Sequence, residues 1–263
     1  MTPDDEPLTP EERRVRDALR GLPAAPADPA FRARMRAGFV AGRASAPAGR
    51  SRRWWLLAAS ILVVGGSVVT LTRPQPWRIV AGPGTGFVTI DGERVALAGV
   101  SRLAGRLVGG VHVVTDAESE LQLQAADAAV LVVTAGSDVR LPSVPGRWFG
   151  RSGEGAVARG ELRGTTGPAF AGVRWHLTLP DAAVEITGTT FAVLRTDEGS
   201  CVCVLDGQVL MATPAARSVV EPGRRLLLAG PTATPLEEAL RPMEQMKLEM
   251  LRETGRALLA GGR

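Results

Sequence analysis

The longest apolar run of the chain covers residues 54–72 and contains no charged side chain. Arg50, Arg52 and Arg53 precede it, and Arg73 follows it. A helix of these nineteen residues would rise about 28 Å, close to the roughly 30 Å hydrocarbon core of a bilayer. A core helix would show polar positions on one face, and a signal peptide would lie nearer the start of the chain. The pattern therefore predicts one transmembrane helix over residues 54–72.

Arginines are unevenly distributed about this segment. Within twenty residues of it, six lie on the N-terminal side and two on the C-terminal side. Positive residues accumulate on the cytoplasmic side of membrane proteins. We therefore expect a single-pass protein of the inner (cytoplasmic) membrane, with a cytoplasmic N-terminus and a C-terminal domain in the periplasm or another extracytoplasmic space.

Residues 1–53 form an Arg-rich tail with two expected short helices, the second over residues 28–42. In that helix Phe31, Met35 and Phe39 recur at intervals of four, so they share one face. This face would lie on the membrane surface or dock into a groove of a cytoplasmic partner, and a flexible tether is the third reading. The chain's net charge of +4 resides in this tail, and anionic lipid explains it as well as nucleic acid does. No direct nucleic-acid partner is expected.

Beyond residue 72 the apolar pattern changes to a period of two, punctuated by Gly, Pro and Asp, which is typical of short strands. Asp91-Gly92 between two such runs predicts a tight hairpin. We expect about a dozen strands with no helical stretch between them, and hence a mainly β fold, an antiparallel sandwich or jelly roll over residues 73–235. The expected strands include 107–115, 156–162, 173–179, 183–187, 191–195, 200–205 and 209–212.

The last segment, residues 236–263, has apolar residues at helical spacing. They are Leu236, Leu240, Met243, Met246, Met250 and Leu251, with Pro242 expected to bend or restart the helix. The pattern predicts an amphipathic C-terminal helix whose Met-rich stripe packs against the β domain or a partner.

The inventory of reactive side chains argues against an enzyme. The chain has two histidines, His112 and His176, no tyrosine, and no nucleophile elbow. Cys201 and Cys203 lie two apart on an expected strand, so both point to one face; a bridge would distort the strand, and core packing is the favoured reading over zinc. Glycines between residues 82 and 86 indicate a turn rather than a phosphate loop. We expect no catalytic residue, no metal and no cofactor.

The segments 179–193, 202–205, 207–209 and 222–223 resemble the core of the FecR-type extracytoplasmic domain, in which a strand ends in Gly-Thr-x-Phe and a Gly-x-Val turn and a late Pro-Gly follow. The resemblance covers roughly residues 105–230. Its motif residues here are Gly188, Thr189, Thr190, Phe191, Gly207 and Gly223. The resemblance implies a structural role for them and offers no catalytic set.

FecR-type proteins combine a cytoplasmic segment, one membrane span and a periplasmic FecR domain, and act as anti-sigma or sigma-regulating factors. The resemblance therefore implies that residues 1–53 hold a sigma factor of the extracytoplasmic-function type, with Phe31, Met35 and Phe39 as the contact. The tail lacks the tryptophans common in that region of the family, and the transporter-contacting domain of iron-regulatory members is replaced by the Met-rich helix. The alternative is a membrane-anchored β module that binds an envelope polymer or protein without regulating a sigma factor.

Overall fold

The computed structural model describes residues 29–40, 76–146, 151–230 and 232–261, and the chain divides into two units at residue 64. In the first unit, helix α2 spans Pro29–Val40, within the helix expected over residues 28–42. The predicted membrane span, residues 54–72, lies outside the described residues. None of the helices that the structure does describe is both long enough and apolar enough to cross a bilayer.

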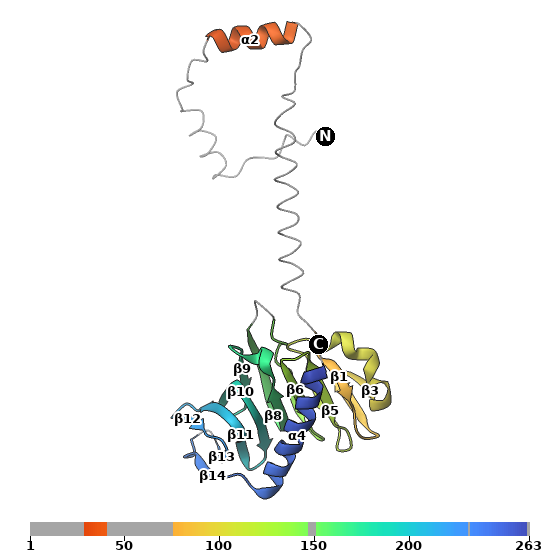
Figure 1. Cartoon of the computed structure of the whole chain (residues 1–263), viewed down its shortest axis with the longest axis vertical. Helices are drawn as coiled ribbons and strands as arrows, with labels where there is room; N and C mark the ends of the chain where they lie inside the picture. Colours follow the sequence, from red (N-terminus) through yellow and green to blue (C-terminus); the bar gives the residue numbers. More distant parts are fainter. Residues whose placement is uncertain (1–28, 41–75, 147–150, 231, 262–263) are drawn as a thin grey trace, which may run out of the picture. The chain divides into compact units, whose positions relative to one another are not determined.

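The second unit is mainly β, which confirms the expected class (Figure 1). Its described strands join into one continuous sheet of fourteen, and every pair is antiparallel except β8 with β9. The strands are β1 (Arg78–Ala81), β2 (Phe87–Ile90), β3 (Glu93–Ala96), β4 (His112–Thr115), β5 (Leu121–Ala125), β6 (Ala129–Val133), β7 (Asp138–Arg140), β8 (Ser152–Thr166), β9 (Arg174–Thr178), β10 (Ala183–Thr196), β11 (Gly199–Ala212), β12 (Arg217–Val220), β13 (Arg224–Leu228) and β14 (Leu236–Ala239).

The sheet folds into two layers because β8, β10 and β11 are long enough to belong to both. The first layer contains β3, β2, β4, β7, the first half of β8, β9, the first half of β10, the second half of β11 and β12. The second contains β1, β5, β6 and the other halves of the three long strands, followed by β13 and β14. The sequence predicted two strands each within residues 183–195 and 200–212. Each pair is instead one strand, since β10 and β11 stay paired through their bends.

The core lies between the layers and is built from alternate residues of each strand. On β6, Leu131 and Val133 face this core, whereas Val130 and Val132 face outward to a helix. Trp77 and Trp175 are fully buried, with ring centroids 5.7 Å apart. The indole N–H of Trp77 donates to the carbonyl of Pro142 at 2.9 Å, so this buried polar atom is satisfied.

Two local expectations have opposite outcomes. The Asp91-Gly92 hairpin is confirmed: Ile90 pairs with Glu93, and both turn residues have positive φ, 47° and 84°. The absence of helical stretches is wrong, because 3₁₀ helices η1 (Leu97–Arg106) and η2 (Pro168–Phe170) interrupt the strands. Leu97, Val100 and Leu103 recur every three residues and enter the core. The strand expected over residues 107–115 is shorter than expected, because β4 begins only at His112.

Helix α4 (Pro242–Gly261) covers the outer face of the second layer (Figure 1). It begins six residues later than expected, because Leu236–Ala239 form the edge strand β14. Pro242 is its first residue, and Glu244 accepts the backbone N–H of Arg241 at 3.0 Å, as in a capping box.

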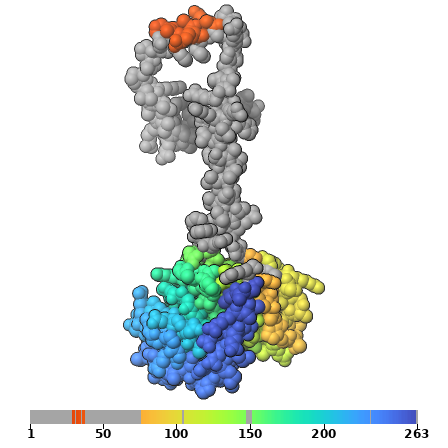
Figure 2. Space-filling view, in the orientation of Figure 1, coloured from red at the N-terminus to blue at the C-terminus, as the bar shows by residue number. Residues whose placement is uncertain are grey.

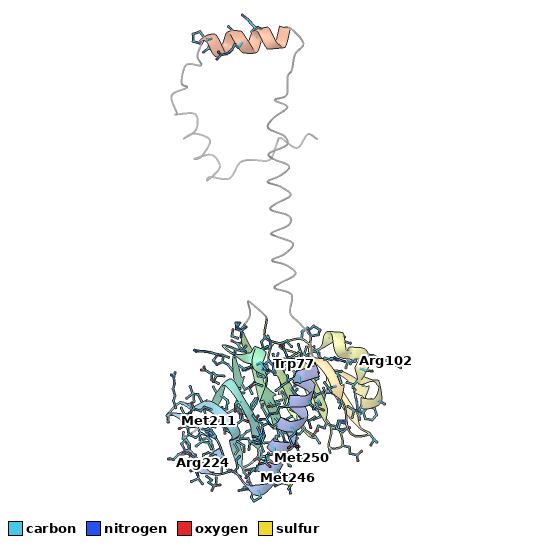
Figure 3. The ribbon with its side chains drawn as sticks, in the orientation of Figure 1. Trp77, Arg102, Met211, Arg224, Met246 and Met250 are labelled. Carbon is cyan, nitrogen blue, oxygen red and sulfur yellow. The ribbon has the colours of Figure 1, made fainter. Side chains whose placement is uncertain are left out.

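The buried side of α4 is not the methionine stripe. Leu248, Leu251 and Leu259 face the sheet, and Gly255 packs on Thr165 of β8. Met243, Met246 and Met250 are 60%, 52% and 63% exposed, and Figure 3 labels two of them beside the helix. Of the two expected packing surfaces for the methionines, the β domain is therefore wrong, and a partner stays a prediction. Leu248, Leu251, Gly255 and Leu259, which follow one another at intervals of three or four, supply the packing face instead.

Candidate functional site

The Gly188–Phe191 motif lies where β10 and β11 pass from the first layer to the second. Ile186 pairs with Val209, but the next pair is Thr189 with Gly207, so β10 carries an extra residue there. A second irregularity follows, since Phe191 pairs with Val204 and leaves an extra residue on β11. Bulges bend strands and increase their twist. The two bulges lie close together, one on β10 and one on β11. They account for the bend that lets each of these strands belong to both layers.

The two glycines of this bend are required by their backbone geometry. Gly188 has φ of 140° and Gly207 has φ of 77°, values that residues other than glycine rarely adopt. A Cβ on Gly207 would overlap the carbonyl oxygen of Gly188. Together they let the two backbones approach closely at the bend.

The motif's threonines connect three strands through buried hydroxyls. Thr166 on β8 accepts the backbone N–H of Thr189 at 2.8 Å, and the Thr189 hydroxyl donates to the carbonyl of Asp206. The hydroxyls of Thr190 and Thr165 lie 2.9 Å apart. Because each buried hydroxyl has a partner, the bend is held in a single arrangement.

The remaining motif positions also have structural surroundings. Phe191 is fully buried, and its ring lies against Gly164 of β8. Gly223, with φ of 74°, forms the turn before β13, where its N–H donates to Val204 at 2.8 Å. Each of the six motif residues thus has a structural role, in a turn, a bulge, a hydrogen bond or the core.

The outer face of the first layer is polar, and no described helix packs across it. Residues alternate outward along β4, β7, β8 and β9. His112 contacts Asp138 at 2.6 Å, and Arg174 lies 3.6 Å from Glu185. Both histidines of the chain, His112 on β4 and His176 on β9, lie on this face.

A hollow of about 540 Å³ opens on the same face. Its lining combines flexible polar side chains with glycines: Gly109, Gly110, Arg140, Ser143, Ser152, Gly153, Glu154 and His176. Side chains at Gly109 or Gly153 would overlap Ser143 or Trp175, so the glycines let the 142–146 segment lie close to the strands. The indole N–H of Trp175 donates to the carbonyl of Ser143 at 3.1 Å and fixes that segment.

The hollow offers a cation, a carboxylate and an imidazole to a polar ligand. Arg140 gives one hydrogen bond to the carbonyl of Gly110 at 3.2 Å, and the remaining N–H groups of its guanidinium can donate. Glu154 and His176 lie side by side because β8 and β9 are parallel here. Sequence reasoning missed this grouping, since parallel pairing of two successive strands is unusual and no motif signals it.

The described residues offer little for metal chemistry. No three His, Cys, Asp or Glu side chains in the described ranges lie close enough together to hold a metal ion. Cys201 and Cys203 lie on the other layer, beneath α4.

The expected partner contacts, Phe31, Met35 and Phe39, fall within α2, but their side chains lie outside the described part. The described side chains of that helix, among them Arg32, Arg34 and Arg36, are exposed. The structure therefore supports the helix and leaves the contact face as a prediction.

Comparison with known proteins identifies one family. Residues 111–210 match the family model described as "FecR protein", which confirms the resemblance on a shorter stretch than residues 105–230. The match runs from β4 to the end of β11 and contains the double bulge. No curated protein matches the chain.

Two crystal structures, at 2.50 and 1.65 Å resolution, of a "putative anti-sigma factor" from Parabacteroides distasonis are similar to this chain. Each has 20% sequence identity and a TM-score of 0.40, and the match covers 48% of this chain and 57% of that one. This chain thus spans little more than half the length of those structures.

Proposed function

Because residues 111–210 form a FecR domain, we propose that the protein is a single-pass membrane regulator of a sigma factor, rather than an enzyme. The N-terminal segment, residues 1–53, binds a sigma factor of the extracytoplasmic-function type in the cytoplasm. Residues 54–72 cross the inner membrane, and the β domain receives a signal on the other side. The family match is the observation that carries this proposal.

Two features of the chain support the assignment. The tail has helix α2, whose Phe31, Met35 and Phe39 share one face by their spacing of four. The arginine excess before residue 54 favours a cytoplasmic tail. An amphipathic helix docking into a groove is a common mode of partner capture.

The test is co-purification of the full-length chain with host sigma factors, with the triple variant Phe31→Ala, Met35→Ala, Phe39→Ala alongside. We expect the native chain to retain a sigma factor and the variant to lose it, with both recovered equally in the membrane fraction. The matched control, Arg32→Gln, Arg34→Gln, Arg36→Gln, removes charge and leaves the apolar face. Binding that depends on the arginines alone, or a chain that retains no sigma factor, would contradict the proposal.

The hollow on the first layer favours a second candidate, a membrane-anchored module that binds an envelope polymer or protein without regulating a sigma factor. Its mixture of guanidinium, carboxylate and imidazole suits a hydroxyl- and carboxylate-bearing polymer. Calorimetric titration with fragments of the host's envelope polysaccharide tests it, using Arg140→Ala and the control Arg174→Ala on β9. Loss of polysaccharide binding in Arg140→Ala but not in Arg174→Ala supports this second function. Equal binding by the two variants excludes the hollow as the binding site.

A further inference from the structure

A pair of thiols lies beneath the first half of α4. Cys201 and Cys203 project from β11 to the outer side of the second layer, with their Sγ atoms 3.9 Å apart. Leu248 of α4 packs directly over them and is 1% exposed. The thiols are 6% and 0% exposed, and they are the only cysteines in the chain. Any disulfide within one molecule must therefore join these two.

A buried arginine accompanies the thiols. Arg225 on β13 is the register partner of Cys203 and is 4% exposed. One of its Nη atoms contacts Glu244 of α4 at 2.7 Å, and its Nε lies 3.7 Å from a carboxylate oxygen of Glu238 on β14 without forming a hydrogen bond. A buried guanidinium costs free energy that simple core packing of two cysteines does not require. The guanidinium is shared between Glu244, Glu238 and the thiols: its charge favours a thiolate at Cys201, and the charge of Glu244 opposes it.

The two thiols are electrostatically unequal. The pKa of Cys201 is lowered, chiefly because the Cys203 thiol hydrogen-bonds to it and also because Arg225 is close, although burial opposes the shift. The pKa of Cys203 is raised by the same hydrogen bond and by burial. A thiolate with a neighbouring thiol is the arrangement of dithiols that exchange with disulfides. Cys201 is also the more exposed of the two, 6% against 0%, so it is the better placed attacking sulfur and Cys203 the resolving one.

Closing this pair into a disulfide would deform β11. Cα atoms two residues apart on a strand are separated by about 6.6 Å, near the upper end of the range that disulfides span. The sulfur atoms must approach from 3.9 Å to about 2.05 Å, so the strand must pucker at Val202. Val202 is paired with Val193 on one side and Leu226 on the other. The pucker would also move the sulfur atoms away from Leu248 of α4, which packs on them.

We propose that Cys201 and Cys203 form a redox-active dithiol whose oxidation to an internal disulfide releases the first half of α4 from the second layer. The oxidant is a disulfide, either a small molecule or an oxidised thiol oxidoreductase. Cys201 thiolate attacks one sulfur of that disulfide, forms a mixed disulfide and expels one thiolate. Cys203 then loses its proton to solvent and attacks the Cys201 sulfur, which expels the second thiolate. Two protein thiols are oxidised, and the oxidant is reduced to two thiols.

Access to the buried sulfurs requires local opening of α4, which is held near the thiols by Leu248 and the Arg225–Glu244 pair. Figure 2 shows α4 in deep blue on the surface, so its opening displaces no other described element from above it. Figure 3 labels Met246 and Met250 on this helix, and both side chains are exposed in the packed state. Release of α4 would thus expose Leu248 along with them.

The experiment treats the full-length reduced chain with oxidised glutathione, then counts alkylatable thiols by mass spectrometry. We expect the count to fall from two to zero in a monomeric chain and to return with dithiothreitol. Cys203→Ser should accumulate the mixed disulfide with glutathione, and Cys201→Ser should form it at least about tenfold more slowly, because Cys203 is fully buried and is less accessible to the oxidant. Persistence of both thiols, or only intermolecular dimers, overturns the dithiol assignment.

Hydrogen exchange on the same samples tests the release of α4. Oxidation should speed exchange of residues 242–251 by about tenfold, while the Cys201→Ser, Cys203→Ser double variant under the same treatment stays unchanged. A disulfide that forms without any change in α4 overturns the release. The double variant also separates the effect of the bridge from any loss of packing caused by the substitutions.

Discussion

Substituting Gly164 by Ala tests how closely the strands approach at the FecR motif. An added Cβ would lie 2.5 and 2.6 Å from two ring atoms of Phe191 and 2.8 Å from a methyl group of Leu131. Ordinary carbon contacts are about 3.5–4.0 Å, so roughly 1 Å must be gained on two sides. Both neighbours are fully buried and cannot turn into solvent.

Overpacking of this kind costs about 1–3 kcal/mol. Alanine is favoured over glycine in a strand by up to about 1 kcal/mol, so the net loss should be about 1–2 kcal/mol. For a domain of this size each kcal/mol corresponds to a decrease of about 2–4 °C in Tm. The expected decrease is therefore about 2–8 °C, measured by thermal unfolding of the full-length chain followed by tryptophan fluorescence.

The matched control is Gly105→Ala in η1, where a Cβ meets no atom within 4 Å, and its Tm should be unchanged or slightly higher. Phe191→Leu shortens the side chain that the new methyl meets. In the double variant Gly164→Ala, Phe191→Leu the two losses should therefore be less than additive by at least about 0.5 kcal/mol. Full additivity, or a neutral Gly164→Ala, would refute the close contact between these strands.

Three further predictions concern other parts of the domain. Gly207→Ala should destabilise by about 2 kcal/mol or more, because it forces an alanine to φ of 77° and against Gly188, and urea unfolding measures it. Gly255→Val would place its side chain into Thr165 and should speed hydrogen exchange throughout α4, while the strands keep their protection. An equal increase of exchange in α4 and in the strands would show global unfolding instead. The pKa of Asp116 lies below its ordinary 3.8 because the Ser119 hydroxyl and the Phe87 amide stabilise the carboxylate, so its stabilisation of the 116–119 turn is present above pH 3.8 and is lost as the pH falls through the lowered value. NMR titration of the Phe87 amide should show this loss, and Asp116→Asn should abolish the pH dependence.

The sequence allowed the class of fold to be predicted because period-two patterns and turn residues are local signals. Asp91-Gly92 and the run Leu121–Ala125 are examples. The continuity of β10 could not be predicted, since Gly188 looks like the end of a strand and only pairing with β11 and β8 carries the strand through it. Likewise the buried face of α4 depends on which side meets Thr165, and its methionines and leucines are equally apolar in sequence.

The candidate sites also differ in whether local sequence signals reveal them. The FecR motif was recognisable because its glycines are set by backbone geometry, which leaves a local signature in the sequence. The hollow near His176 was not, because it needs Arg140, Glu154 and the 142–146 segment to come together from distant positions. The neighbouring charge of Arg225 at the thiols is likewise a product of pairing between β11 and β13.

Because three strands belong to both layers, the layers are joined by continuous backbone and not only by loops. Two sheets joined only by loops can slide or open along their interface, whereas here covalent backbone crosses that interface three times, in β8, β10 and β11. A strain imposed on the polar face of one layer cannot be absorbed between the layers. A change in the spacing of the layers therefore requires these three backbones to bend, and Gly188 and Gly207 lie where two of them already do. Thr189 and Thr190, the next two residues of β10, bond to β8, so a change in this bend would also shift the strand against which α4 packs.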